Sequence, residues 1–160
     1  KINYMSKSIL LPNKFKKIGW FILIPSILIG IFLPFSDYRP DWLNGKMVTI
    51  FHSWTDEKYF AVLNVNFTNT IIGVLLIIGG LLVSFSEEKN EDEFISKIRF
   101  TSLLWAVLVN YVLLLIAFVF VYEIEFFHVM IYNMFTVLII FIVRFNYILF
   151  KNSKKLSNAE

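Results

Sequence analysis

The chain has 160 residues, of which 58% are hydrophobic and only 17% are charged, whereas soluble domains average about 45–50% apolar residues. It contains 18 Phe and no Cys, which excludes a disulfide framework, a thiolate nucleophile and Cys ligands to a metal. The formal net charge of +3 is carried by basic residues that flank apolar runs, a pattern that indicates membrane orientation and favours no nucleic-acid partner.

Four apolar runs without Lys, Arg, Asp or Glu lie at residues 18–35, 67–85, 103–122 and 126–143. About 20 apolar residues in a helix cross a hydrocarbon core of about 30 Å, and a lipid-exposed segment must satisfy its own backbone hydrogen bonds. We therefore predict an all-α integral membrane protein, a four-transmembrane-helix up-down bundle that forms one domain over residues 1–156. Residues 157–160 resemble the remnant of an expression vector, and we expect no function of them.

The basic residues are divided unevenly among the segments that flank these runs. Twelve of the 15 Lys and Arg residues lie before the first run, between the second and third, or after the fourth; only Arg39, Lys46 and Lys58 lie between the first and second. The cytoplasmic side of a membrane protein carries the excess of Lys and Arg. We therefore expect both termini and the inner loop, residues 86–101, in the cytoplasm, and the outer loop, residues 36–66, on the opposite side.

The outer loop is too long for a bare connector, and long loops usually carry structure of their own. Residues 47–53 and 59–67 are rich in β-branched and aromatic side chains, and in the second segment apolar and polar residues alternate in part. This period of two predicts a small extracytoplasmic β-hairpin whose turn lies at residues 54–58. An irregular aromatic-rich loop at the membrane surface is the alternative.

The inner loop has the pattern of a helix start. Asn90 and Glu93 have the three-residue spacing of a capping box, and acidic residues occupy the first turn, where the helix dipole favours them. No Pro or Gly separates this segment from the third run. We therefore predict one helix from about residue 91 to residue 122, and we expect the fourth helix to continue to about residue 150.

Three apolar residues form a stripe on this predicted inner segment: Phe94, Ile95 and Ile98. They lie beyond the hydrocarbon core, where exposed apolar clusters seek partners. We expect the cytoplasmic end of the fourth helix to cover the stripe and to place two basic residues near the acids; a partner protein is the alternative cover. The covering and basic residues are Phe145, Ile148, Leu149, Arg144 and Lys151.

Several segments of the chain are similar to one family. They are residues 11–20, 86–95, Arg99, 102–105, 109–111 and 144–147. Together they resemble a family of small bacterial membrane proteins with four predicted spans and no assigned function. The resemblance implies the same topology, in the bacterial inner membrane, and it implies no reaction.

Glu123, Glu125 and His128 are the candidate metal ligands, and they lie near the outer ends of the third and fourth runs. The three-residue spacing of Glu125 and His128 puts two ligands on one helix face, as in carboxylate-bridged metal bundles. Such bundles repeat and bury the motif, whereas this chain has one copy at an interface. A solvated connector is therefore favoured over a metal site, and we expect no cofactor.

Asn110 is the most polar residue deep in the third run. An intramembrane polar residue is a functional candidate by default. The competing interpretation, which we favour, is a hydrogen bond between helices that fixes their packing.

Glycines fall on one face of each of the first two runs, Gly19 with Gly30 and Gly73 with Gly80. Small residues let helix backbones approach closely. Close packing within the bundle is the favoured interpretation, and a homodimer seam is the alternative.

The chain contains no Walker loop, GxSxG, HExxH or GxGxxG motif, and no ionised pair inside a span. Ion-coupled transporters normally keep a carboxylate or a Lys inside the bilayer. We therefore predict a non-enzymatic membrane scaffold or accessory protein that binds a cytosolic or membrane protein through its cytoplasmic helical extensions. A small oligomeric pore or carrier for a neutral or small polar solute is the alternative. The candidate interaction surface comprises Glu91, Asp92, Glu93, Arg99 and Arg144.

Overall fold

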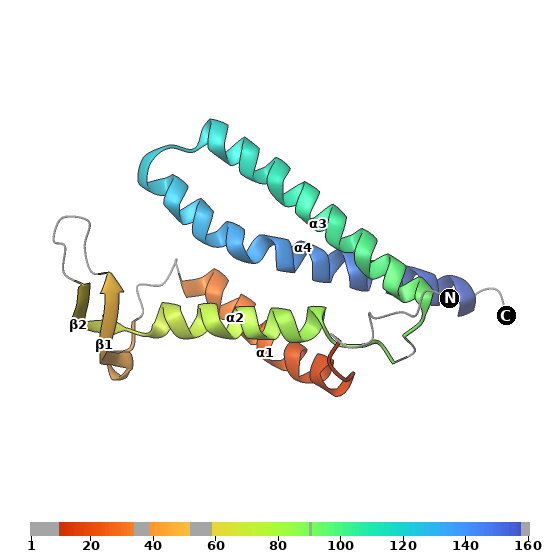
Figure 1. The fold of residues 1–160 in the computed structure, drawn as a ribbon, viewed down its shortest axis with the longest axis horizontal. Helices are drawn as coiled ribbons and strands as arrows, with labels where there is room; N and C mark the ends of the chain where they lie inside the picture. The colour runs from red at the N-terminus through yellow and green to blue at the C-terminus, as the bar shows by residue number, and fades with distance from the viewer. Residues whose placement is uncertain (1–9, 34–38, 52–58, 90, 158–160) are drawn as a thin grey trace.

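The computed structural model describes residues 10–33, 39–51, 59–89 and 91–157. Within these ranges the chain forms four helices and one two-stranded antiparallel sheet (Figure 1). The fold is therefore helical apart from one β-hairpin, as predicted. The elements are α1 (Lys14–Phe32), β1 (Asn44–Phe51), β2 (Tyr59–Asn66), α2 (Thr68–Ser84), α3 (Glu93–Phe120) and α4 (Glu123–Ser157).

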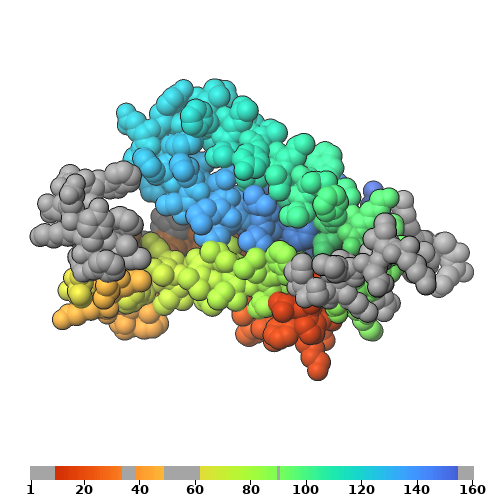
Figure 2. All heavy atoms as spheres, in the orientation of Figure 1, coloured from red at the N-terminus to blue at the C-terminus, as the bar shows by residue number. Residues whose placement is uncertain are grey.

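Successive helices run in opposite directions and form two pairs, α1 with α2 and α3 with α4 (Figure 1). The blue atoms of α4 lie between the green atoms of α3 and the yellow-green atoms of α2, so that α4 joins the pairs (Figure 2). α1 and α3 begin, and α2 and α4 end, toward one end of the molecule, which we call the basic end. The sheet and the α3–α4 connection lie toward the opposite end, the hairpin end.

Three helices, α1, α3 and α4, are long and apolar enough to cross a membrane by length and composition. Of the most apolar 18 residues in each, only 17%, 11% and 11% are buried, respectively. A helix in water buries its apolar face, so this degree of exposure suits a lipid surrounding. α2 is also apolar but has 17 residues, a length of about 26 Å at 1.5 Å per residue. The structure thus supports three of the four predicted spans by length and places α2 at the lower limit.

The start of α2 is fixed by the end of the sheet. Asn66 is the last residue of β2, and its Oδ1 accepts a hydrogen bond of 3.0 Å from the backbone N–H of Thr68. The same side chain donates to the backbone carbonyl of Pro40 at 3.1 Å and to Oδ1 of Asn44 at 2.8 Å. One asparagine therefore ties the loop, both strands and the first turn of α2 together.

The predicted cap of α3 is wrong. Asp92, in an extended conformation, is the N-cap, and its Oδ1 accepts a hydrogen bond of 2.8 Å from the backbone N–H of Ile95. α3 consequently begins at Glu93 rather than near residue 91, while Asn90 lies outside the described residues. Asp is as good an N-cap as Asn. Asp92 therefore caps the backbone three residues further on, as predicted for Asn90, but two residues later in the chain.

The other helix ends also move from their predicted positions. α1 begins at Lys14 rather than 18, because its basic lead consists of good helix formers. It ends at Phe32, with Leu33 as C-cap; residues 34 and 35 lie outside the described residues. α4 begins at Glu123 rather than 126 and continues to Ser157, beyond the predicted end near residue 150.

The connection between α3 and α4 is only two residues long. α3 ends at Phe120, and Val121 is extended (φ −115°, ψ 128°), so the final two residues of the predicted third run form the turn. Glu123 then adopts a φ of 58°, in the left-handed region, which side chains other than Gly occupy at some cost. So short a turn forces α4 to return antiparallel to α3.

The predicted hairpin is confirmed. β1 and β2 pair in antiparallel register, with Asn44 opposite Asn66 and Met47 opposite Leu63. Leu63 and Val65 are half-buried whereas Val62 is exposed, which is the period of two expected for a strand with one covered face. β1 starts three residues earlier than predicted, after a short 3-10 turn at Asp41–Leu43. The predicted turn at 54–58 lies outside the described residues.

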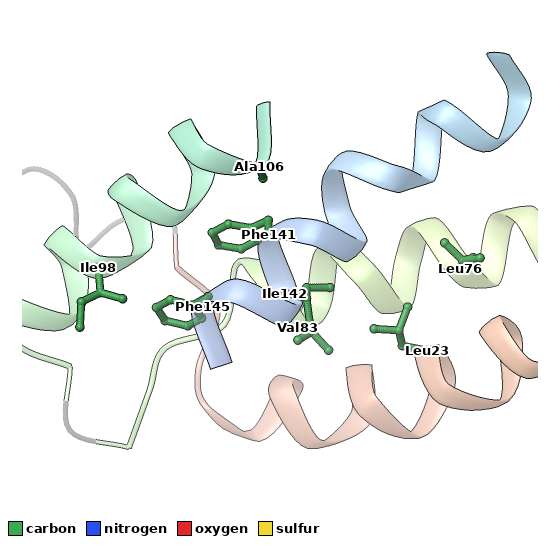
Figure 3. Close-up of a cluster of buried hydrophobic side chains, with 8 residues drawn as sticks. All are labelled: Leu23, Leu76, Val83, Ile98, Ala106, Phe141, Ile142 and Phe145. Carbon is green, nitrogen blue, oxygen red and sulfur yellow. The ribbon is translucent and has the colours of Figure 1, made fainter. Parts of the chain in front are cut away.

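The buried apolar core of the described residues is small and lies between all four helices. Val83 of α2 faces Ile142 of α4, and Phe141 of α4 faces Ala106 of α3, whose side chain is fully buried (Figure 3). Toward the basic end, Ile98 of α3 lies beside Phe145 of α4 (Figure 3). The full set is Leu23, Leu76, Val83, Ile98, Ala106, Phe141, Ile142 and Phe145.

The predicted apolar stripe at the start of α3 is covered in part. Ile98 is buried in the core, and Ile95 packs against the same cluster, as do Ile148 and Leu149 of α4. The end of α4 is thus the cover that the sequence indicated. Phe94, however, remains 56% exposed and is not among the residues that pack against the core.

Glycines determine how closely α1 and α2 approach. A Cβ on Gly79 would lie 2.9 Å from the backbone N of Leu23, and a Cβ on Gly19 would lie 2.9 Å from the backbone N of Val83. Gly73 and Gly80 instead face side chains of α4, at 3.8 Å and 3.4 Å from their nearest atoms. The glycine faces therefore serve packing within the chain, which was the favoured interpretation.

Gly79→Ala should destabilise the protein, because its methyl group meets the backbone of α1 and can be accommodated only by separating the helices. We expect the free energy of unfolding to fall by about 1–3 kcal/mol, as in overpacked cores, in denaturant titrations followed by circular dichroism in detergent. Gly73→Ala is the matched control: its methyl group has room, and the gain in helix propensity is up to about 1 kcal/mol. Equal stability of the two variants would contradict the close approach.

Candidate functional site

The segments that flank the helices at the basic end form a short backbone pairing. The N–H of Leu11 donates to the carbonyl of Phe85 at 2.7 Å, and the N–H of Glu87 donates to the carbonyl of Leu11 at 2.8 Å. Asn13 adds a side-chain hydrogen bond of 2.7 Å to the carbonyl of Glu87. The chain before α1 is therefore fixed against the chain after α2, and this positions the charged residues around it.

Two ion pairs lie within this frame, and both are largely buried. Lys16 of α1 pairs with Glu88, and the two side chains are only 14% and 16% exposed. Arg99 of α3 pairs with Glu91 at 2.9 Å, with side chains 14% and 19% exposed. Together with Phe145 of α4, these four charged residues form what we call the basic-end cluster.

Arg99 makes the most contacts in the basic-end cluster. Its Nη1 donates to the backbone carbonyls of Ser84 and Ser86, at 2.8 Å and 3.1 Å, while Nη2 donates to both carboxylate oxygens of Glu91. The guanidinium carbon lies 4.8 Å from the centroid of the Phe145 ring, within the range of a cation–π contact. One side chain thus joins the end of α2, the α2–α3 connection, α3 and α4.

The ring of Phe145 receives a second cation, since Nζ of Lys16 lies 5.9 Å from its centroid. Glu91 is likewise used twice, because its Oε2 also accepts a hydrogen bond of 2.8 Å from the backbone N–H of Glu88. The charges of the basic-end cluster are therefore matched internally. This arrangement holds three helices and a connection in place and leaves little of Glu91 or Arg99 for an external partner.

The structure divides the predicted interaction surface. Glu91 and Arg99 pair with each other, Asp92 caps α3, and only Glu93 is an exposed acid without a contact among the described residues. Among the described residues Arg144 forms no ion pair with these acids, contrary to the prediction: its guanidinium carbon lies 4.6 Å from the centroid of the Trp105 ring. Two acids of the α2–α3 connection instead form ion pairs with Lys16 of α1 and Arg99 of α3.

Asn110 forms a reciprocal hydrogen-bonded pair with Asn133 of α4, at 3.3 Å and 3.1 Å. Asn110 is 3% exposed. This is the contact between helices that the packing interpretation requires. Sequence reasoning missed Asn133, although a signal existed. Asn110 lies ten residues before the last residue of α3, and Asn133 lies ten after the first residue of α4. Equal distances from a tight turn bring two positions side by side.

The candidate metal ligands are open to solvent. Nδ1 of His128 lies 3.6 Å from Oε2 of Glu125, and the two side chains are 58% and 73% exposed. Among the described residues, no three His, Cys, Asp or Glu side chains are grouped so that they could hold a metal ion. Glu123 is instead the first residue of α4, directly after the α3–α4 connection, and has a left-handed φ.

The comparisons with known proteins give no relative: no protein-family model, no curated protein and no solved structure matches the chain. The resemblance to small four-span bacterial membrane proteins stays a prediction.

Arg99→Met should destabilise the protein strongly, because it retains the stem over Phe145 but removes the donors to Glu91 and to two buried carbonyls. We expect a loss of about 2–3 kcal/mol in the free energy of unfolding in detergent, since breaking a mostly buried pair leaves an uncompensated charge. Lys97→Met, at an exposed position of the same helix, is the control and should change stability by less than about 0.5 kcal/mol. An equal loss of unfolding free energy in both variants would show that the contacts of the Arg99 guanidinium do not stabilise the fold.

Asn110→Leu should cost about 1 kcal/mol, because it leaves the amide of Asn133 without its partner in an apolar surrounding. The double variant Asn110→Leu with Asn133→Leu should recover most of that loss, since no polar group is then left unpaired. Thermal unfolding in detergent measures both, with Tyr111→Leu at an exposed neighbouring position as control. Strictly additive losses in the double variant would contradict the pair.

Proposed function

We propose that this chain is a four-span protein of a bacterial inner membrane, with its basic end in the cytoplasm, that acts as a non-enzymatic scaffold or accessory protein. It binds a partner protein through the cytoplasmic end of α4. The observation that carries the proposal is an exposed stripe on this end of the helix, which we call the α4 stripe. It consists of Tyr147, Phe150, Lys151 and Lys154.

The membrane placement draws support from the apolar exteriors of α1, α3 and α4 and from the distribution of charge. Lys14, Lys16 and Lys17 lie in the first turn of α1, and the basic residues after residue 143 lie at the same end. Such an excess of Lys and Arg marks the cytoplasmic side. α2 is the remaining span. It packs closely on α1 and has the shortest length that crosses a bilayer.

The length of α4 carries its last turns out of the bilayer. Its 35 residues extend about 53 Å, whereas the hydrocarbon core is about 30 Å thick. In the α4 stripe the residues are spaced at i, i+3, i+4 and i+7, which places them on one helix face. Tyr147 and Phe150 are 62% and 69% exposed. Two aromatic rings beside two lysines form a surface that matches an apolar, acidic face of a partner.

The opposite side of this segment of α4 is held firmly. The ring of Phe145 is contacted by the cations of Arg99 and Lys16, and Ile148 and Leu149 pack against the core. The α4 stripe is therefore presented on a rigid support, which lowers the ordering cost of binding. The pore or carrier alternative has less support, because the amides of Asn110 and Asn133 hydrogen-bond to each other.

A photo-crosslinking side chain in place of Phe150 tests the proposal in native membranes. We expect one discrete protein adduct, and the added double change Lys151→Glu with Lys154→Glu should weaken it roughly tenfold, because two favourable charge contacts become repulsive. The same crosslinker at Trp42, which is 79% exposed near the sheet, is the control and should not give that adduct.

Two results would overturn the proposed function. One is that the crosslinker at position 150 captures only lipid. The other is that the purified protein, reconstituted alone, moves a small polar solute across vesicle membranes.

A further inference from the structure

A groove of about 430 Å³ lies between α3 and α4, and no residue of the basic-end cluster lines it. Aliphatic side chains form most of its lining, and one cation and two amphipathic aromatic rings complete it. We call it the Arg144 groove. The residues used in the argument are Val109, Ile140, Val143, Trp105, Arg144 and Tyr147.

The guanidinium of Arg144 has no carboxylate partner among the described residues, in contrast to Arg99 and Lys16, which are both paired. It lies 4.6 Å from the Trp105 ring centroid. Its Nε is buried and makes no hydrogen bond to any described residue. A buried donor of a half-buried cation is unfavourable without a partner, and a planar guanidinium pairs best with carboxylate or phosphate.

The position of Arg144 along α4 indicates which anion. It follows directly after the apolar run of residues 126–143, so in a membrane it lies at the depth of the cytoplasmic headgroups. Trp and Tyr prefer this same depth, and both Trp105 and Tyr147 line the groove there. The aliphatic part, Val109 and Ile140, lies about one turn further toward the middle of the bilayer, since each residue is four positions from Trp105 or Arg144 on its helix.

We propose that the Arg144 groove is a binding site for an anionic phospholipid, whose phosphate contacts the Arg144 guanidinium while an acyl chain lies along Val109, Ile140 and Val143. A lipid of this kind supplies both the anion and the apolar chain at the required spacing. The inference rests on the membrane placement in the proposed function. It is independent of the α4 stripe, except that Tyr147 borders both.

Native mass spectrometry of the detergent-purified protein tests the site with two probes, dioleoyl phosphatidylglycerol and dioleoyl phosphatidylcholine at equal concentration. We expect the wild type to retain phosphatidylglycerol about fivefold more, the factor that corresponds to about 1 kcal/mol for one cation at the membrane surface. Arg144→Gln should bring this ratio close to one. Lys97→Gln removes an equal charge at the basic end but outside the groove, and should leave the ratio unchanged.

Val109→Trp gives a second test that retains the charge. It fills the aliphatic part of the groove, so retention of both lipids should fall severalfold. A wild-type ratio near one, or equal ratios for Arg144→Gln and Lys97→Gln, would overturn the site. So would displacement of the lipid by millimolar inorganic phosphate, or crosslinking between two copies through Val143→Cys, since a second copy would then occupy the groove.

Failure of the membrane placement has a separate readout. Release of the chain from membranes by alkaline carbonate would remove the basis of both proposals, whereas retention in the membrane with an unchanged Arg144→Gln ratio would remove only the lipid site.

Discussion

The arrangement of the helices depends on a single guanidinium. Arg99 binds two backbone carbonyls at the end of α2, a carboxylate in the α2–α3 connection and the ring of Phe145 on α4. Buried ion pairs contribute little net stability because desolvation offsets the attraction, but wrong arrangements would leave a buried charge unpaired. The main effect of this contact is therefore to specify one arrangement: it fixes how α3 lies against the end of α2 and which face of α4 turns inward.

Away from the basic-end cluster, the two helix pairs are held by different means. α1 and α2 approach through Gly19 and Gly79, so that backbone meets backbone, while α3 and α4 are held by their two-residue connection and by the pair of Asn110 with Asn133. Few of the apolar side chains of the helices are buried, so most of them lie on the outer faces of the helices. Lipid is the surrounding that suits them. Among the described residues, exposed charged side chains lie at the basic end, near the sheet and at the start of α4.

This division explains where interactions are available. Glu91 and Arg99 belong to the interaction surface that the sequence predicts, but they form a largely buried ion pair with each other. Two sets of groups on α4 stay available: the aromatic and lysine side chains of the α4 stripe, and the guanidinium of Arg144 over Trp105. In the proposed membrane placement, one helix thus offers both a face toward the cytoplasm and a groove at headgroup depth, and the same core supports both.

The sequence by itself determined the local structure. The hydrophobic runs, the period of two around Leu63 and Val65, and the unbroken inner segment specified the helices and the hairpin, because such patterns report which face of an element is covered. Helix starts were misplaced by a few residues, because Asn90 and Asp92 are equally good caps. Only the tertiary structure decided the partners: Arg99 with Glu91, Lys16 with Glu88, and Asn110 with Asn133. Charge and polarity place a residue at one end of the molecule, but the contact it makes depends on how helices distant in sequence rotate against one another.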